Sequence, residues 1–165
     1  MKIIDNFLPD QDFKVIQKEL FSPYFPWYFN SEVLDEDKYN LYTNHFQFTH
    51  SFYIDNMPSQ RFFLLKPLID KINPFSIIRI KANLTTQMEH IVEHGLHTDF
   101  GNKNSKITTA IYYINNNNGY TKFQDGTKTE SKENRFVEFD SSSFHTGTNC
   151  TDEKRRIVIN FNYIK

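Results

Sequence analysis

The chain has 165 residues, enough for one domain with a proper core, and nothing in its length requires a second domain. Nineteen basic side chains balance twenty acidic ones, so there is no overall basicity to attract nucleic acid. The single cysteine, Cys150, excludes an internal disulfide; the first residues lack the long apolar stretch that a signal peptide would have, and we expect no transmembrane segment. We therefore expect a soluble, cytoplasmic protein that binds neither membrane nor nucleic acid.

The first half of the chain predicts helices and irregular structure. All six prolines lie before residue 75, and all five glycines lie after it. Apolar residues at helical spacing predict a helix over 10–20 and a second over 59–72, which Pro67 should kink or restart. The aromatic stretch between them has no regular period, apart from a short predicted strand at 45–48.

The second half has the pattern of strands and turns. Strands are predicted over 77–84, 107–114, 135–139 and 155–164. The run of four asparagines before Gly119 predicts a hairpin turn, because Asn and Gly tolerate positive φ. The fold class is therefore mainly β with N-terminal helices. We expect a jelly-roll barrel formed by 76–165 and supported on one outer face by 1–75, all in a single domain.

Three residues of the second half could bind a metal ion. On an extended strand, His97 and Asp99 would point to the same face. His145 follows a hydrophobic run and precedes Gly147, a suitable place for a third ligand. Two histidines and one carboxylate form the facial triad that holds Fe(II) and leaves coordination positions open.

A pair of arginines, Arg155 and Arg156, follows the third candidate ligand at the start of an Ile/Val strand. An arginine could bind the far carboxylate of a dicarboxylic co-substrate through two parallel hydrogen bonds. On a regular strand the two side chains point to opposite faces, so only one can enter the barrel.

With these motifs the sequence resembles the 2-oxoglutarate and Fe(II)-dependent dioxygenases, in particular the prolyl-4-hydroxylase-like branch. The matching segments are His97-Thr98-Asp99, Tyr112-Tyr113-Ile114-Asn115, Gly119-Tyr120, Asn134-Arg135-Phe136, His145-Thr146-Gly147 and Arg156-Ile157-Val158-Ile159-Asn160. The resemblance covers roughly 76–164 and implies a double-stranded β-helix.

The resemblance also implies roles for individual residues. His97, Asp99 and His145 would bind Fe(II), and Arg156, or failing that Arg155, would bind 2-oxoglutarate. Tyr113 matches a co-substrate-binding tyrosine of prolyl hydroxylases. Prolyl hydroxylases have a further tyrosine before the segment that matches His97-Thr98-Asp99. It has no counterpart in this sequence, and the nearest alignment places Asn83 at its position. The implied reaction consumes O2 and 2-oxoglutarate, releases succinate and CO2, and hydroxylates an unactivated C–H bond.

Two other functional hypotheses have to be weighed. The segment His90-Ile91-Val92-Glu93-His94 matches the HxxEH pattern of zinc peptidases, which requires a helix. Gly95 and the poorly helical residues upstream argue against one. The second hypothesis is a non-catalytic β-helix that binds a ligand or partner through the same cavity. The complete ligand set argues against it, because a binding module has no need for a metal triad and an arginine.

The substrate is not determined by the sequence. A peptidyl proline is suggested by the resemblance, but a free amino acid, a metabolite or a nucleic-acid base would use the same centre. We expect the aromatic N-terminal segment and residues 102–105 and 124–133 to select the substrate, with His90 and His94 beside the pocket mouth. Cys150 has no assigned role, and the oligomeric state is not readable.

Overall fold

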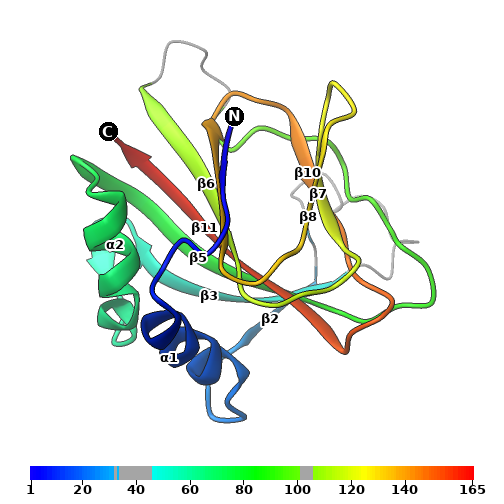
Figure 1. Ribbon diagram of the computed structural model, residues 1–165, viewed down its shortest axis with the longest axis horizontal. Coiled ribbons are helices and arrows are strands. Elements are labelled where there is room, and N and C mark those ends of the chain that lie inside the picture. The colour runs from blue at the N-terminus through cyan, green and yellow to red at the C-terminus, as the bar shows by residue number, and fades with distance from the viewer. Residues whose placement is uncertain (32, 34–45, 101–105) are drawn as a thin grey trace.

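The computed structural model describes residues 1–31, 33, 46–100 and 106–165. Figure 1 shows a large twisted sheet with the helices on one side of it and a small second sheet on the other. The strand order of the large sheet is β1-β9-β6-β11-β5-β3-β2, with β4 paired to β3, and the small sheet has the order β10-β7-β8. All these strand pairs are antiparallel, which confirms the predicted mainly-β class.

The elements of the N-terminal half include both helices and strands. The helices are α1 (Asp10–Phe21), the 3-10 helix η2 (Phe62–Leu65) and α2 (Lys66–Ile72). Pro67 lies in the first turn of α2, so the predicted second helix restarts there, as a proline at this position allows. The strands are β1 (Lys2–Ile4), β2 (Tyr28–Asn30), β3 (Gln47–Ile54) and β4 (Met57–Pro58). These strands join the large sheet, so residue 75 does not separate a helical support from the β core.

The C-terminal half supplies the remaining strands. They are β5 (Ser76–Thr86), β6 (Ile107–Tyr113), β7 (Tyr120–Phe123), β8 (Lys128–Glu130), β9 (Arg135–Asp140), β10 (His145–Gly147) and β11 (Arg155–Ile164). The four strands predicted in this half correspond to β5, β6, β9 and β11. Of the stretch predicted as a strand at 45–48, residue 45 lies outside the described residues and the strand begins at Gln47.

The predicted hairpin at Asn115–Gly119 is wrong. β6 lies in the large sheet and β7 in the small one, and the two do not pair, so this segment is a crossover between sheets. Its backbone does not use positive φ. Instead, the Asn115 side chain receives a hydrogen bond from the Ile157 N–H (3.1 Å) and donates one to the Arg155 carbonyl (2.9 Å). The true hairpin joins β7 and β8 through Gly126, which has φ 87°.

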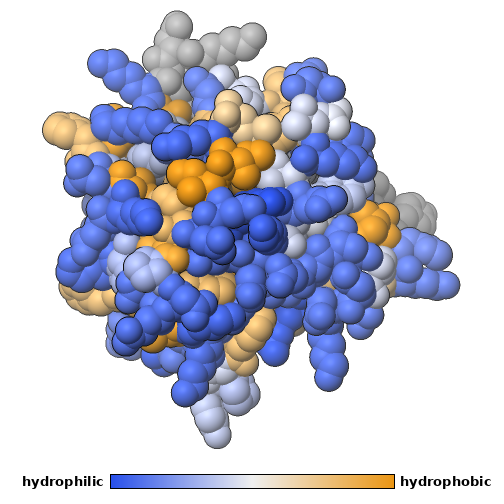
Figure 2. Space-filling model, in the orientation of Figure 1, coloured by the Kyte–Doolittle hydropathy of each residue, from blue (hydrophilic) through white to orange (hydrophobic). Residues whose placement is uncertain are grey.

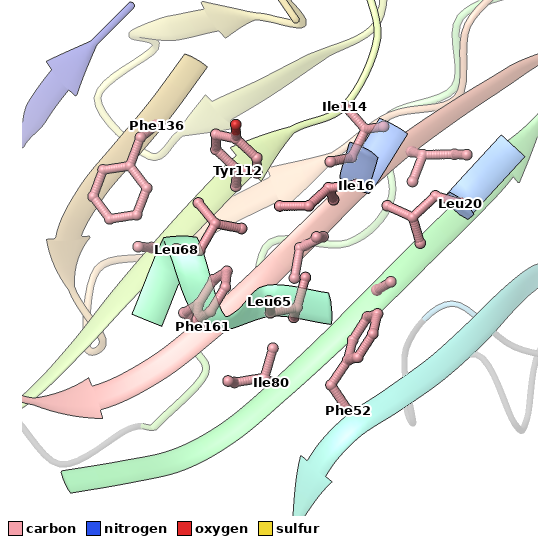
Figure 3. Close-up of a cluster of buried hydrophobic side chains, with 14 of the residues drawn as sticks. Ile16, Leu20, Phe52, Leu65, Leu68, Ile80, Tyr112, Ile114, Phe136 and Phe161 are labelled. Atoms are coloured by element: carbon pink, nitrogen blue, oxygen red, sulfur yellow. The ribbon is translucent and has the colours of Figure 1, made fainter. Parts of the chain in front are cut away.

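The main hydrophobic core lies between the helices and the outer face of the large sheet (Figure 3). Ile16 and Leu20 of α1 and Leu65 and Leu68 of the second helical segment are fully buried there. They pack with alternate residues of the central strands, such as Ile80 and Phe161. The opposite face of the same strands is thereby turned towards the small sheet, where the candidate site lies.

The molecular surface is mainly hydrophilic on the face shown in Figure 2, with apolar side chains in separate groups. Within the described ranges, none of the helices is long and apolar enough to span a membrane.

Candidate metal centre

His97, Asp99 and His145 come together between the two sheets. One ligand atom from each lies within 4.8 Å of the others. His97 and His145 form an isolated antiparallel bridge, with backbone N–H to carbonyl distances of 3.0 and 2.9 Å. The prediction that His97 and Asp99 share a regular strand is wrong, because Asp99 lies in a bend just after this bridge. Pairing with β10, rather than strand alternation, holds the segment in place.

Backbone carbonyls orient both imidazole rings. The Nδ1 atom of His97 lies 3.2 Å from the Gly95 carbonyl oxygen, and Nδ1 of His145 lies 3.0 Å from that of Ser143. A carbonyl oxygen only accepts hydrogen bonds, so each neutral ring carries its proton on Nδ1. The lone pair of Nε2 is then available for a metal ion, as is usual for histidine ligands with such partners.

Three side chains hold the Asp99 carboxylate. Arg79 donates to Oδ1 at 3.1 Å, while Thr109 and Asn162 donate to Oδ2 at 2.8 and 2.9 Å. Burial tends to raise the pKa of Asp99, but the charge of His145 when that ring is protonated, the charge of Arg79 and these hydrogen bonds outweigh burial and leave the pKa below its usual value. Asp99 is therefore an oriented carboxylate, ready to act as a ligand.

His145 lies in an apolar surrounding on one side of the centre. Its side chain is almost fully buried, and the Phe139 ring meets its ring edge-to-face at a centroid distance of 4.8 Å. Burial lowers the pKa of His145, although the Asp99 charge opposes this shift. The neutral form, which is the form that binds metals, is therefore favoured.

A cavity of roughly 400 Å³ opens beside these three residues. The predicted residues Asn83 and Arg156 also line it. Arg155 does not line it, and its guanidinium lies 4.6 Å from the ring centre of Phe21 on the outer, helical side of the sheet. The two arginines thus face opposite sides of β11, and Arg156 is the one on the cavity side.

The surroundings of Arg156 contain no acidic partner within the described part of the chain. The side chain is buried, donates from Nε to Ser131 Oγ at 2.8 Å, and has Nη2 3.4 Å from Thr121 Oγ1. Burial lowers the pKa of Arg156. A buried cation without a counter-charge is costly, so the site favours an anionic ligand.

Gly119 makes room for Arg156. A Cβ atom at this position would lie 2.6 Å from Arg156 Cδ and 2.4 Å from the Asn149 carbonyl oxygen. Both distances are much shorter than van der Waals contact. Any larger residue would therefore push the arginine or the backbone out of place. This close approach, rather than turn formation, explains the glycine after the asparagine run.

Tyr113 does not line the cavity but contacts Thr121 and Arg156, which do. The Tyr113 ring is fully buried and is not among the residues that line the cavity. Its hydroxyl donates to Thr121 Oγ1 at 2.7 Å. Thr121 lines the cavity and has its own hydroxyl proton to donate there.

The HxxEH segment forms no helix. Residues 90–94 have no helical turn, and Glu93 forms an isolated bridge with Thr148. The Glu93 carboxylate receives hydrogen bonds from Tyr120 and Lys122, both at 2.7 Å. His94 lines the cavity, whereas the His90 side chain is 82% exposed. The pair of zinc ligands on one helix face that this motif requires does not exist here.

Sequence reasoning missed several residues of the site. Arg79, Thr109 and Asn162 hold the predicted ligand Asp99, and Thr121 and Ser131 contact Arg156. A signal was present in the alternation of polar and apolar residues along 79–85 and 156–162. Of the segments expected to select the substrate, 102–105 lies outside the described residues, while 124–133 contains Ser131.

Neither a protein-family model nor a curated protein matches this sequence. Solved structures match it over almost the whole chain. A Trichoplax adhaerens prolyl hydroxylase in complex with a hypoxia inducible factor peptide has a TM-score of 0.69 at 15% identity, covering 99% of this chain and 82% of that one. A viral collagen prolyl hydroxylase from Paramecium Bursaria Chlorella virus-1 has a TM-score of 0.56 at 14% identity, with coverages of 99% and 90%.

The same fold carries other reactions. The non-heme alpha ketoglutarate dependent epimerase SnoN from nogalamycin biosynthesis has a TM-score of 0.66 at 12% identity, covering 99% of this chain and 75% of that one. The chain therefore has the fold of prolyl hydroxylases and other 2-oxoglutarate and Fe(II) oxygenases, as its motifs predict. Because an epimerase is about as similar as a prolyl hydroxylase, the fold does not specify the substrate.

Proposed function

We propose that this protein is a 2-oxoglutarate- and Fe(II)-dependent dioxygenase that hydroxylates an unactivated C–H bond, in a single catalytic domain. The observation that carries the proposal is Arg156, a buried arginine without an acidic partner among the described residues, which faces the same cavity as the two-histidine, one-carboxylate cluster. A metal site alone would not need this cation. Together, Arg156 and the cluster match a co-substrate that chelates a metal at one end and carries a carboxylate at the other.

The donor set fits Fe(II). His97 and His145 present Nε2, because their Nδ1 atoms face carbonyl oxygens, and Asp99 presents an oriented carboxylate. Nitrogen and oxygen donors in this number are typical of non-haem Fe(II) oxygenases and leave positions for other ligands. His97, Asp99 and His145 would therefore hold the metal.

The residues around Arg156 fit 2-oxoglutarate. The guanidinium would pair with the distal carboxylate, and the Thr121 hydroxyl would donate a further hydrogen bond to it. Tyr113 would position Thr121 rather than bind the co-substrate itself, since its hydroxyl is already directed at Thr121 Oγ1. Asn83, whose buried Oδ1 has no hydrogen-bond partner among the described residues, would complete the wall beside the co-substrate.

When bound, Fe(II), 2-oxoglutarate and O2 supply the oxidising power, with release of succinate and CO2. The protein contributes placement and protection. Asp99 and the two histidines are fixed by their hydrogen bonds, and Phe139 excludes water on the His145 side. Arg156 would neutralise the distal carboxylate of the co-substrate and set the direction of the co-substrate in the cavity.

Uncoupled turnover tests the proposal without knowledge of the substrate. The purified protein with Fe(II), 2-oxoglutarate and O2 should form succinate slowly, and His145→Ala should not. Lys18→Met, a change on the exposed side of α1, serves as the matched control and should behave as wild type. A protein that binds both Fe(II) and 2-oxoglutarate but forms no succinate would be a binding module and would refute the enzyme assignment.

A further inference from the structure

The segment that carries His97 has no helix or regular strand of its own. Residues 88–97, called the strap below, run along β10 on the opposite edge from β7. The strap forms isolated bridges only, which pair Glu93 with Thr148 and His97 with His145. Because few backbone hydrogen bonds hold such a segment, it can open locally while the rest of the protein stays folded.

His97 is the ligand whose position depends on this segment. Three side chains hold Asp99, and His145 lies within β10. The Nδ1 atom of His97, by contrast, faces the carbonyl oxygen of Gly95, which belongs to the strap itself. The backbone of His97 is held by its bridge to His145. Whatever fastens the strap therefore also places His97.

Buried side chains beside β10 fix the course of the strap. Asn149 accepts a hydrogen bond from the Val92 N–H at 2.6 Å and donates one to the His90 carbonyl at 2.8 Å. The Thr146 hydroxyl donates to the His94 carbonyl. Asn149 and Thr146 are each only 1% exposed, so their removal would disturb the fold as well as the strap.

Glu93 fastens the strap at the surface. Its side chain crosses β10 to reach β7, where the carboxylate receives hydrogen bonds from the Tyr120 hydroxyl and from Lys122 Nζ, both at 2.7 Å. Lys128 Nζ of β8 lies 3.8 Å away. The Glu93 and Lys122 side chains are 35% and 33% exposed. Contacts of this kind contribute modestly and are weakened by salt, so their loss loosens the strap without unfolding the protein.

We infer that Glu93 is a positioning residue of the metal centre, which latches the strap to β7 and thereby keeps His97 in place against local opening. The latch is a property of the metal-free protein, and its effect on a bound Fe(II) ion rests on the proposed function. The glutamate of the segment 90–94 thus supports a metal centre from outside, whereas the zinc-peptidase pattern would make it a base.

Hydrogen exchange on the metal-free protein measures the latch directly. Three strap amides report its opening, because each donates a hydrogen bond out of the strap: those of Val92, His94 and His97. Glu93→Ala should raise their exchange rates about 3- to 10-fold, whereas amides of the central strands β5 and β11 should exchange as in wild type.

Glu89→Ala is the matched control. Glu89 lies in the same strap and carries the same charge, but its side chain is 89% exposed and its recorded contact is a 3.8 Å approach to the neighbouring His90. This variant should leave the three exchange rates unchanged. Lys122→Met, which removes the partner instead of Glu93, should reproduce most of the effect of Glu93→Ala, and Lys122→Arg should keep the wild-type rates.

Release of Fe(II) into an excess of chelator shows whether the latch acts on the metal centre. Anaerobic Glu93→Ala should release iron about 3- to 10-fold faster than wild type, in proportion to its faster exchange. Added salt should speed release from wild type towards the rate of Glu93→Ala and change the variant little, since salt screens an exposed ion pair. In the double variant with Lys122→Met, the two effects should not add.

Unchanged exchange at the three amides in both Glu93→Ala and Lys122→Met would overturn the inference. Faster exchange without faster iron release would also overturn it, because opening of the strap would then not displace His97. Failure of wild type to bind Fe(II) would instead refute the proposed function. The exchange experiment uses no metal, so the two failures are distinguishable.

Discussion

Gly119→Ala should weaken co-substrate binding through Arg156, although Gly119 itself does not line the cavity. The new Cβ would lie 2.6 Å from Arg156 Cδ and 2.4 Å from the Asn149 carbonyl oxygen. The φ angle of Gly119 is not in the left-handed region, so the effect is steric and not a backbone preference. Overpacking of this kind costs about 1–3 kcal/mol of stability.

The loss of affinity follows from displacement of the guanidinium. A hydrogen bond to a charged group is worth about 1.5–3 kcal/mol, so losing one raises the dissociation constant of 2-oxoglutarate by roughly 10- to 100-fold. Anaerobic titration of the Fe(II) protein with 2-oxoglutarate measures this constant, and urea unfolding measures the stability.

Gly147→Ala is the matched control for this substitution. A Cβ at Gly147 would meet only Arg156 Nη1, at an ordinary contact distance of 3.8 Å. This variant should bind 2-oxoglutarate within about threefold of wild type, a difference below 1 kcal/mol. If folded Gly119→Ala binds 2-oxoglutarate as tightly as wild type, the reasoning about Arg156 placement is refuted.

Three further predictions concern Arg79, the pair of Thr121 and Tyr113, and Asp5. Arg79→Met removes a hydrogen bond to Asp99 and should raise the dissociation constant of Fe(II) by about 10- to 100-fold, measured by competition with a chelator; an unchanged constant would contradict the role of Arg79. Thr121→Val should weaken 2-oxoglutarate binding by about 3- to 10-fold and Tyr113→Phe by less, since Tyr113 acts through Thr121; the reverse order would show direct binding by Tyr113. Hydrogen bonds from Arg135 and Lys132 lower the pKa of Asp5 from 3.8 to about 2, so its stabilising effect is present above pH 3.8 and lost as the pH falls towards 2. Asp5→Asn should therefore be less stable than wild type by about 0.5–1 kcal/mol at pH 7, and the difference should shrink as the pH falls through 2 and vanish below it, by urea unfolding at each pH.

The fold class and the grouping of His97, Asp99 and His145 were predictable because they depend on local patterns. Period-two alternation marked β5, β6, β9 and β11, and the spacing of His97, Asp99 and His145 indicated a metal centre. Alternation also predicted that only one of Arg155 and Arg156 faces the cavity, since consecutive residues of a strand point to opposite faces, while the preference for Arg156 came from the resemblance.

The failures arose where long-range pairing decides the structure. An asparagine run before a glycine has turn propensity, but propensity does not distinguish a hairpin from a crossover between two sheets. The Asn115 amide bonds to the backbone of β11, a contact that no local pattern reveals. Likewise, the segment His97-Thr98-Asp99 is held by the bridge between His97 and His145 of β10 and not by a strand of its own.

The residues around Asp99 were missed for a related reason. Polar residues that alternate with apolar ones on a strand are usually read as facing solvent. Here the helices cover the apolar face of β5, so Arg79 and Lys81 face an internal cavity instead. The small sheet lies opposite the polar face of β5, and only this placement reveals that the polar residues of β5 form a site.

Anaerobic titration with Fe(II) and 2-oxoglutarate tests the central claim most directly. The chelated complex has a visible charge-transfer band, which wild type should develop on addition of both components. Asp99→Ala should show no band, and Arg156→Ala should need at least 10-fold more 2-oxoglutarate to reach it. Absence of the band in iron-loaded wild type, or an unchanged 2-oxoglutarate requirement in folded Arg156→Ala, would contradict the assignment of this cavity to a 2-oxoglutarate-dependent iron centre.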